Sequence, residues 1–271
     1  MKKLISSLLL ILFIGIGSVF AQPTQQYTFQ KYYLDVNPTD IPRFLELHKE
    51  MTDASMQSDL RTLNGHYVKR HMYAGKASLV LYEVYDSVDD LNADDLWGSI
   101  GEYTADMSEE DLLAFNARAA EWWSMWLEGH TDEVRVLQVS GFGDEDFSWQ
   151  SPGVIINSYY TPKWSDGATF REAYEALDKA TEMCGNAAGS RISTHYSGSG
   201  TTYEGYVFYN SWDDFAADEK AIQECRQQYV EDLPAVTETY WGVAGEHWDE
   251  IYIPVGSYVD GEFKLSAHFT N

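Results

Sequence analysis

Hydrophobic residues follow a strand pattern and then a helix pattern twice along this chain. Residues 27–36 and 153–162 are rich in aromatic and β-branched residues, as strands are. The first run is followed by Phe44, Leu47 and Met51, which fall on one face of a helix. The second run is followed by a matching apolar stripe made by Phe170, Ala173, Tyr174 and Leu177. Each half of the chain is therefore predicted to begin with a strand and an amphipathic helix.

A strand pair, a second helical region and a final strand come next in both copies. Residues 65–75 and 77–85 form the first pair, and residues 189–200 and 201–209 form the second, with glycine-containing turns between the strands. The final strands are DEVRVLQV and DEIYIPV. The two halves thus have the same predicted order of elements.

One phrase of the sequence is written almost identically in both copies. Residues 82–95 read YEVYDSVDDLNADD and residues 206–219 read YVFYNSWDDFAADE, with seven of fourteen positions identical. This identity indicates an internal duplication. The first strands are aligned here by matching Tyr32 and Tyr33 to Tyr159 and Tyr160.

The repeat covers about 27–149 and 153–265, which is almost the whole chain after its N-terminal segment. The order strand–helix–strand–strand–helix–strand in about 110 residues is that of the ferredoxin-like split βαβ unit. Such a unit carries its helices on one face of an antiparallel sheet and leaves the other face bare. Two tandem copies can cover each other's bare faces, so an α+β fold built from two packed sheets is predicted.

This pattern of element order and duplication resembles the dimeric α/β-barrel superfamily, here with two units fused in one chain. The resemblance implies that the two ferredoxin-like βαββαβ units form one α/β barrel with an interior cavity. Members of the superfamily include cofactor-independent monooxygenases, polyketide cyclases, haem-dependent enzymes, isomerases and stress proteins. No catalytic motif of these branches matches this sequence residue by residue. The resemblance therefore carries over the fold and the cavity, but no active site.

The duplication also predicts the domain boundaries. The first repeat is expected at 22–138, a linker rich in Gly and Asp at 139–153, and the second repeat with a C-terminal tail at 154–271. Because the fused pair covers its own sheets, we expect a monomer with internal pseudo-twofold symmetry, a pseudo-dimer within one chain.

The N-terminal segment has the features of a signal peptide at residues 1–21. Lys2 and Lys3 precede an apolar run that ends at Phe20, and Val19 and Ala21 are the small residues before the expected cleavage site. A membrane anchor is the alternative, since the apolar run approaches the length that spans a bilayer. The signal-peptide interpretation places the mature protein outside the cytoplasm, as a secreted or periplasmic protein.

The chain is strongly acidic, with 43 Asp and Glu against 18 Lys and Arg and a net charge of −25. Nucleic acids and anionic membranes are bound through Lys and Arg, so neither is an expected partner. The acidic surface is interpreted as a solvated coat. The expected partner is a small-molecule ligand in the barrel interior.

The second strand of each copy carries the clearest candidates for chemistry. His71 and His195 coincide when the copies are aligned, and imidazole can act as acid or base near neutral pH. Side chains alternate between the two faces of a strand, so one face holds polar groups in both copies. The alternative is an edge strand whose polar residues face water. The catalytic candidates are His71, His195, Tyr73 and Glu83, and the ligand-binding candidates are Lys69, Arg191, Tyr85 and Tyr209. For Glu83, an ordinary surface carboxylate remains an alternative.

Two further features have both functional and structural interpretations. A duplicated H-x-D-E, at 130–133 and 247–250, mixes metal-ligand types but equally fits a polar entry into the last strand, so no metal site is assigned. Trp122, Trp123 and Trp126 have helical spacing and are expected in the core. Trp149 and Trp164 lie in predicted loops and could present exposed rings to a sugar.

The predicted function is that of a secreted small-molecule-binding barrel. Its most specific form is a cofactor-independent enzyme of the oxygenase, cyclase or isomerase type acting on a small organic or aromatic compound, and no cofactor motif is present. A non-catalytic protein that binds carbohydrate or another partner is the alternative. The sequence alone leaves open whether the protein is an enzyme.

Cys184 and Cys225 are the only cysteines, and an exported protein meets an oxidising compartment. Both are expected on helices of the second repeat that lie side by side on the sheet. A disulfide between them is therefore predicted, and two buried thiols are the alternative.

Overall fold

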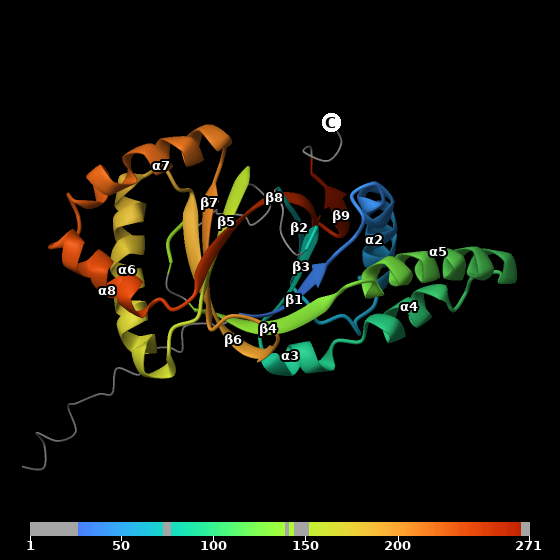
Figure 1. The fold of residues 1–271 in the computed structure, drawn as a ribbon. Helices are drawn as coiled ribbons and strands as arrows, with labels where there is room; N and C mark the ends of the chain where they lie inside the picture. The colour runs from blue at the N-terminus through green and yellow to red at the C-terminus, as the bar shows by residue number, and fades with distance from the viewer. Residues whose placement is uncertain (1–26, 73–76, 139–140, 144–151, 267–271) are drawn as a thin grey trace, which may run out of the picture.

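The computed structural model describes residues 27–72, 77–138, 141–143 and 152–266. Strands occupy the middle of the molecule, and the helices of each half cover one outer side (Figure 1). The helices of the first half lie opposite those of the second half across the strands. Each sheet thus has helices on one face and the other half of the chain on its second face.

The two halves contain matching elements in the same order. The first half contains β1 (Thr28–Leu34), α2 (Ile41–Ser55), β2 (Gly65–His71), β3 (Leu79–Tyr85), α3 (Val88–Ala93), α4 (Leu96–Thr104), α5 (Glu109–Leu127) and β4 (Thr131–Gln138). The second half contains β5 (Val154–Tyr160), η1 (Trp164–Asp166), α6 (Gly167–Cys184), β6 (Gly189–Gly198), β7 (Tyr203–Tyr209), α7 (Trp212–Arg226), α8 (Leu233–Val243), β8 (His247–Val259) and β9 (Glu262–Leu265). Within the described residues, no helix combines the length and apolar character needed to cross a bilayer.

The strand order is β2-β3-β1-β4 in the first half and β6-β7-β5-β8 in the second. The identical orders confirm the predicted tandem duplication. Antiparallel pairing of β4 with β6 and of β2 with β8 then joins the two sheets at both edges. In the described part of the chain, eight strands close into one barrel, and β9 pairs with β8 outside this ring. The predicted fold class, two ferredoxin-like units forming one α/β barrel, is confirmed.

The strand register corrects the alignment of the first strands by one residue. Lys31 pairs with Tyr82 in the first half, and Asn157 pairs with Tyr206 in the second. Since Tyr82 and Tyr206 occupy the same place in the duplicated phrase, Lys31 and Asn157 are equivalent. The equivalent of Tyr159 is therefore Tyr33, not Tyr32. A shift of one residue moves every side chain of a strand to the other face, which is why the correction matters for the barrel interior.

The duplicated phrase encodes the junction between a strand and a helix. Ser87 Oγ accepts from the backbone N–H of Asp90 at 3.1 Å and caps α3, and Ser211 caps α7 in the same way. The phenol of Tyr85 donates to Asp94 at 3.3 Å, and that of Tyr209 donates to Asp218 at 2.8 Å. The phrase is thus repeated because each half needs the same cap and the same link between strand and helix.

Large aromatic side chains pack beside aliphatic ones in the layers between helices and sheet. Trp122 and Trp126 of α5 are buried, as predicted, and Trp123 packs partly buried against the same cluster. Phe170 and Tyr174 of α6 pack on Tyr160 in the second half. Aromatic side chains bury large areas, so these rings contribute strongly to the packing of helices on the sheet.

A pair of buried histidines links α2 to β2 in the first layer. The Nε2 atoms of His48 and His66 lie 2.6 Å apart, and Trp122 Nε1 donates to His48 Nδ1 at 3.2 Å. An indole N–H can only donate, so His48 carries its proton on Nε2 and donates it to His66. Burial, together with the charge of Arg61, lowers the pKa of His66 to about 3, and burial and the neighbouring His66 lower that of His48. Both rings are neutral in the folded protein.

This pair predicts a loss of stability in mild acid. Below pH 6.5 a histidine of the unfolded chain binds a proton, whereas His66 of the folded protein binds one only near pH 3. Stability must fall as the pH falls, by about 2.3 kcal/mol between pH 6.5 and 4.5 for His66 alone, and His48 acts in the same direction. Urea unfolding across this range measures the slope. His66→Gln should flatten it, and an unchanged slope in this variant would contradict the assignment.

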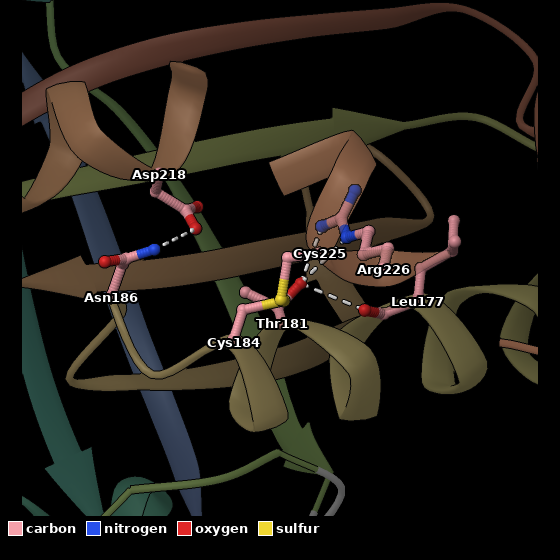
Figure 2. The surroundings of a disulfide bond; sticks show 7 residues. All are labelled: Leu177, Thr181, Cys184, Asn186, Asp218, Cys225 and Arg226. Carbon is pink, nitrogen blue, oxygen red and sulfur yellow. Dashed lines mark hydrogen bonds between the residues drawn. A yellow bond between two sulfur atoms is a disulfide. The ribbon is translucent and has the colours of Figure 1, made fainter. Parts of the chain in front are cut away.

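The predicted disulfide is present and joins α6 to α7 (Figure 2). The Cα atoms of Cys184 and Cys225 are 5.9 Å apart. Beside the bridge, the guanidinium of Arg226 donates to the hydroxyl of Thr181 at 2.6 Å, which ties the same two helices together. The bridge closes a loop with a sequence separation of 41 residues.

Removal of the disulfide should lower the free energy of unfolding by about 3–4 kcal/mol, because the unfolded chain regains the entropy of a long loop. The double variant Cys184→Ser/Cys225→Ser and the reduced wild-type protein should show the same loss in urea unfolding. Thiol titration of the unfolded, unreduced wild type should detect no thiol. Two reactive thiols in that sample would rule out the bridge.

Candidate functional site

The barrel interior holds four charged side chains at its centre: Lys31, Glu133, Arg135 and Glu204. All four are buried, with exposed fractions of 1% or less. Lys31 Nζ donates to the two oxygens of Glu204 at 2.7 and 2.9 Å, and Arg135 Nη1 donates to Glu133 Oε2 at 2.8 Å. The cross-pairs are also close, with Lys31 3.8 Å from Glu133 and Arg135 3.6 Å from Glu204. These four residues, called the buried quartet below, balance two positive against two negative charges.

Hydroxyl groups complete the hydrogen bonds of the quartet. Tyr33 OH lies 2.8 Å from Glu133 Oε1 and 3.0 Å from Glu204 Oε1. Tyr206 OH donates to Glu204 Oε2 at 2.5 Å, and Arg135 Nε donates to Ser193 Oγ at 2.7 Å. Satisfied hydrogen bonds are what make buried charges tolerable in a dry interior.

The two carboxyl groups of the quartet differ in pKa because their surroundings differ. Burial raises the pKa of Glu204, but the charges of Arg135 and Lys31 outweigh it and bring the pKa to about 2. Burial and the charge of Glu204 raise the pKa of Glu133. Glu204 is therefore the permanent anion, and Glu133 is the carboxyl that accepts a proton more readily.

A cavity of about 960 Å³ opens at one end of the barrel, above the quartet. Tyr33 connects the two, because it lines the cavity and hydrogen-bonds the quartet. Gly200 lies against the carboxylate of Glu133, and a Cβ at this position would fall 1.8 Å from Glu133 Oε2. A side chain at this position in the turn between β6 and β7 would fit only if the carboxylate of Glu133 moved. This end of the barrel is called the first mouth.

Glu250, Tyr159 and Trp248 form one wall of the first mouth, and the buried Tyr252 contacts Glu250. The phenol of Tyr159 donates to Glu250 Oε2 at 2.9 Å, and the phenol of Tyr252 donates to the same oxygen. The ring of Trp248 stacks on that of Tyr159 with centroids 4.9 Å apart and 9° between the planes, and Trp248 is 42% exposed. Burial raises the pKa of both phenols well above its ordinary value, so they act as donors to the carboxylate.

A second, smaller cavity of about 320 Å³ lies at the other end of the barrel. Its walls are mainly apolar or aromatic. Among the described residues that line it, Lys69 is the only Lys, Arg, Asp or Glu. Lys69 Nζ lies 4.2 Å from the ring centre of Tyr82 and 5.3 Å from that of Tyr206. Tyr206 lines this cavity and also donates a hydrogen bond to Glu204 of the quartet, so the quartet lies between the two cavities.

The two histidines proposed from the sequence lie on strands that border the first mouth. His71 is half-buried on β2, with its ring 5.1 Å from that of Tyr252 on the neighbouring β8. His195 is half-buried on β6, and its Nε2 lies 3.1 Å from the carbonyl oxygen of Gly198. Their catalytic role stays a prediction. Tyr73 lies outside the described residues.

Lys69 lines the second cavity, and the remaining candidates line neither of the two barrel cavities. Glu83 and Tyr85 are on the outer, helix-covered side of β3, where Glu83 accepts from Arg61 at 2.7 Å and from Tyr85 at 3.2 Å. Tyr209 lies on the equivalent side of β7, bonded to Asp218. The guanidinium of Arg191 donates to the carbonyl of Phe142. In this structure these contacts tie strands to helices and to the segment after β4.

The duplicated H-x-D-E motif has a structural explanation in which only its glutamate points inward. Glu133 pairs with Lys31 and Glu250 pairs with Asn157 in the strand register, so the two glutamates are equivalent. His130 is exposed, and His247 Nε2 lies 3.1 Å from Asp249 Oδ1. Among the described residues, no group of three or more His, Cys, Asp or Glu side chains is placed to hold a metal ion.

Sequence reasoning missed the charges of the quartet, above all Lys31 and Arg135. The signal was present as alternation, since Phe29, Lys31 and Tyr33 share one face of β1. A lysine between two aromatic residues of one strand face is unusual at a solvated surface and is a sign of an interior polar cluster.

Removing one charge of the quartet should destabilise the protein strongly. Removing two opposite charges together should destabilise it less. Lys31→Met leaves Glu204 short of a buried partner and should destabilise the protein by about 3–5 kcal/mol. The double variant Lys31→Met/Glu204→Gln keeps the charge balance and should recover part of this loss in urea unfolding.

The exposed ion pair of Arg43 and Glu121, with N and O atoms 2.7 Å apart, supplies the matched control. Arg43→Met should cost much less stability than Lys31→Met, because water screens an exposed pair. If the buried and exposed single variants lose equal stability, the quartet does not have the energetic role assigned to it.

The sequence matches no protein-family model, and no curated protein matches it either. Solved structures do share its fold. An anthrone oxidase-like protein superposes with a TM-score of 0.57 at 14% identity, covering 90% of this chain and 97% of its own. A candidate monooxygenase from Fusobacterium nucleatum subsp. nucleatum gives a TM-score of 0.53 at 10% identity, covering 89% and 98%. At these identities the likeness establishes the fold, and it agrees with the dimeric α/β barrel predicted from the sequence.

Proposed function

We propose that this protein is an exported barrel that binds a small planar organic molecule in the first mouth and acts on it by proton transfer, without a cofactor. The observation that carries the proposal is the wall formed by Glu250, Tyr159 and Trp248. It places a carboxylate held by phenols next to the exposed ring of Trp248, which stacks on the buried ring of Tyr159. A concave site with aromatic walls and a few convergent polar groups is the usual form of a small-molecule site.

The aromatic pair selects the shape of the ligand. Trp248 already stacks on Tyr159 on one side, so its exposed part offers a flat surface for a second ring. The cavity of about 960 Å³ has room for a compound of several rings. A planar phenol, quinol or aromatic ketone fits these walls better than a flexible aliphatic chain.

Glu250 is the group assigned to proton transfer. The hydrogen bonds from Tyr159 and Tyr252 both end on Oε2, so a bound ligand would meet Oε1. A carboxylate in this place can remove a proton from a phenolic O–H or from a C–H beside a carbonyl. The two phenols hold the carboxylate in one orientation throughout. His71, close to Tyr252, is the second candidate for passing this proton to solvent.

Two further observations support parts of the proposal. The disulfide between Cys184 and Cys225 is typical of proteins that fold outside the reducing cytoplasm, which supports export. One protein with this fold is described as anthrone oxidase-like, and an anthrone is an aromatic ketone. That likeness concerns the fold, and the ligand class proposed here rests on the cavity.

A non-catalytic carbohydrate-binding function is the second candidate, favoured by exposed indole rings. Trp164 is 98% exposed, and Trp241 is 52% exposed with its ring 4.9 Å from that of His247. Sugars stack on such surfaces. Titration with soluble polysaccharides distinguishes the two: saturable binding that survives a filled first mouth would favour this candidate.

The proposal predicts different effects for the two key residues of the wall. With anthrone and 2-naphthol as probes, Trp248→Ala should weaken binding about tenfold through loss of the stacking surface. Glu250→Gln keeps the shape and should leave binding within about twofold, while turnover falls on the order of 10²–10⁴-fold. Fluorescence titration measures binding, and absorbance with oxygen consumption measures turnover.

Trp212→Ala, at an exposed tryptophan of α7 outside the mouth, is the matched control and should change neither quantity. His71→Ala should slow turnover if this residue passes the proton onward, and unchanged turnover would remove it from the site. Probes that bind wild type and Trp248→Ala equally well would refute the proposed mouth.

A further inference from the structure

The second cavity is walled mainly by rings, and its walls come almost entirely from the first half of the chain. Of the described residues that line it, all but Tyr206 belong to that half. Phe29 and Tyr82 are buried in its wall, and their ring centres lie 5.8 Å apart. The ring of Tyr206 meets these two rings edge-on, at 6.3 and 6.5 Å. The cavity is thus a pocket of rings that already meet one another at an angle.

A difference between the two copies leaves room for this pocket. The duplicated phrase aligns Val84 with Phe208. Val84 pairs with Phe29 on the first strand of its half, and Phe208 pairs with Ile155 at the equivalent place. Phe208 is fully buried, whereas Val84 is half-buried and lines the cavity. The first half therefore has a small side chain, and an opening, where the second half has a buried ring.

We infer that the second cavity binds a small, uncharged aromatic molecule with a single ring, which takes the place that a phenylalanine side chain holds in the other half. This site is separate from Glu250 and the first mouth, and the inference does not depend on the function proposed there.

The walls define the class of ligand. The volume of about 320 Å³ is at the lower end of the range for small-molecule sites, so one ring with a short substituent fits it. Rings in the wall favour an aromatic ligand, because edge-to-face contacts add to the gain from burying apolar area. A charged ligand would lose its water on entering such walls, and an uncharged ligand avoids this cost.

The rim offers a polar contact for a hydroxyl group on the ring. Asn64 is an exposed residue of the lining, and its Nδ2 donates to Asp86 Oδ1 at 2.7 Å. This bond holds the carboxamide, whose oxygen is the acceptor that a ligand hydroxyl requires. A phenol therefore suits the cavity better than a plain hydrocarbon ring.

The experiment is a nuclear magnetic resonance titration of the folded wild-type protein, labelled at its valine and leucine methyl groups, with phenol. The methyl groups of Val84 and Leu137 report on this cavity, because both residues line it and neither lines the first mouth. Their resonances should shift in a saturable way and show nuclear Overhauser effects to the ring protons of phenol. Cyclohexanol, which has no aromatic face, should bind about two- to tenfold more weakly than phenol.

Three variants test the site. Val84→Phe introduces the ring that the other half carries and should weaken phenol binding at least about tenfold, as measured at the Leu137 methyl groups. Asn64→Ala should weaken binding about two- to tenfold through the loss of one hydrogen bond. Trp248→Ala, at the opposite mouth, is the control and should leave the affinity within about twofold.

Unchanged Val84 and Leu137 resonances at the highest soluble phenol concentration would overturn the inference. So would equal phenol binding by Val84→Phe, or cyclohexanol binding as tightly as phenol, since the rings would then select nothing. Equal binding by Asn64→Ala would overturn the hydroxyl contact. The wild-type titration decides the matter even if a variant fails to fold. Failure of anthrone or 2-naphthol to bind at the first mouth would refute the function proposed there and leave this result untouched.

Discussion

Closure of the barrel at two seams is the constraint on which the rest of this structure depends. β4 pairs with β6 and β2 pairs with β8, so neither sheet keeps a free edge in the ring and neither keeps a bare face. The space inside is enclosed by backbone and rings and excludes bulk water from its centre. In such a place charges interact strongly and are tolerated only when paired. The buried quartet is the direct consequence of putting polar residues there.

The two halves have diverged where they face each other and stayed alike where they contact their own helices. Outside the barrel, the serine caps and the tyrosine–aspartate links are the same in both copies. Inside, Lys31 has Asn157 as its equivalent, and Arg135 has Tyr252. Each copy must fold its own helices onto its own sheet, so those contacts are needed twice. The interior is shared, so one residue of each kind is enough.

This division also explains why the ends of the barrel differ. Arg135 donates a hydrogen bond to Glu133 within the quartet. The equivalent glutamate, Glu250, accepts a hydrogen bond from Tyr252 instead and lies at the first mouth. On the second strands, Lys69 pairs with Val80 and Ser193 pairs with Glu204, so the amine and the hydroxyl are equivalent positions with different chemistry. A duplicated chain with two identical interiors would place like charges against each other. Because the interior residues differ between the two halves, opposite charges face each other and form pairs.

The sequence by itself determined the local and periodic features of this protein. Alternation of side chains, helix stripes and the duplicated phrase were enough for the element order, the duplication and the α/β barrel. The two cysteines, read with a second half whose helices lie side by side, were enough for the disulfide. These features depend on neighbours along the chain or on the fold class, and short-range patterns record them.

The tertiary structure decided which polar residues meet. Lys31 and Glu204 are 173 positions apart in the sequence, and no local pattern indicates that β1 faces β7 across a barrel. The face of each strand depended on a register that the sequence alignment missed by one residue at Tyr33. The register also decides which residues of β3 face inward. Tyr82 faces the barrel interior, whereas Glu83 and Tyr85 of the same strand lie on the side covered by helices. Side-chain direction follows from pairing partners, and those partners are set only when the two sheets close.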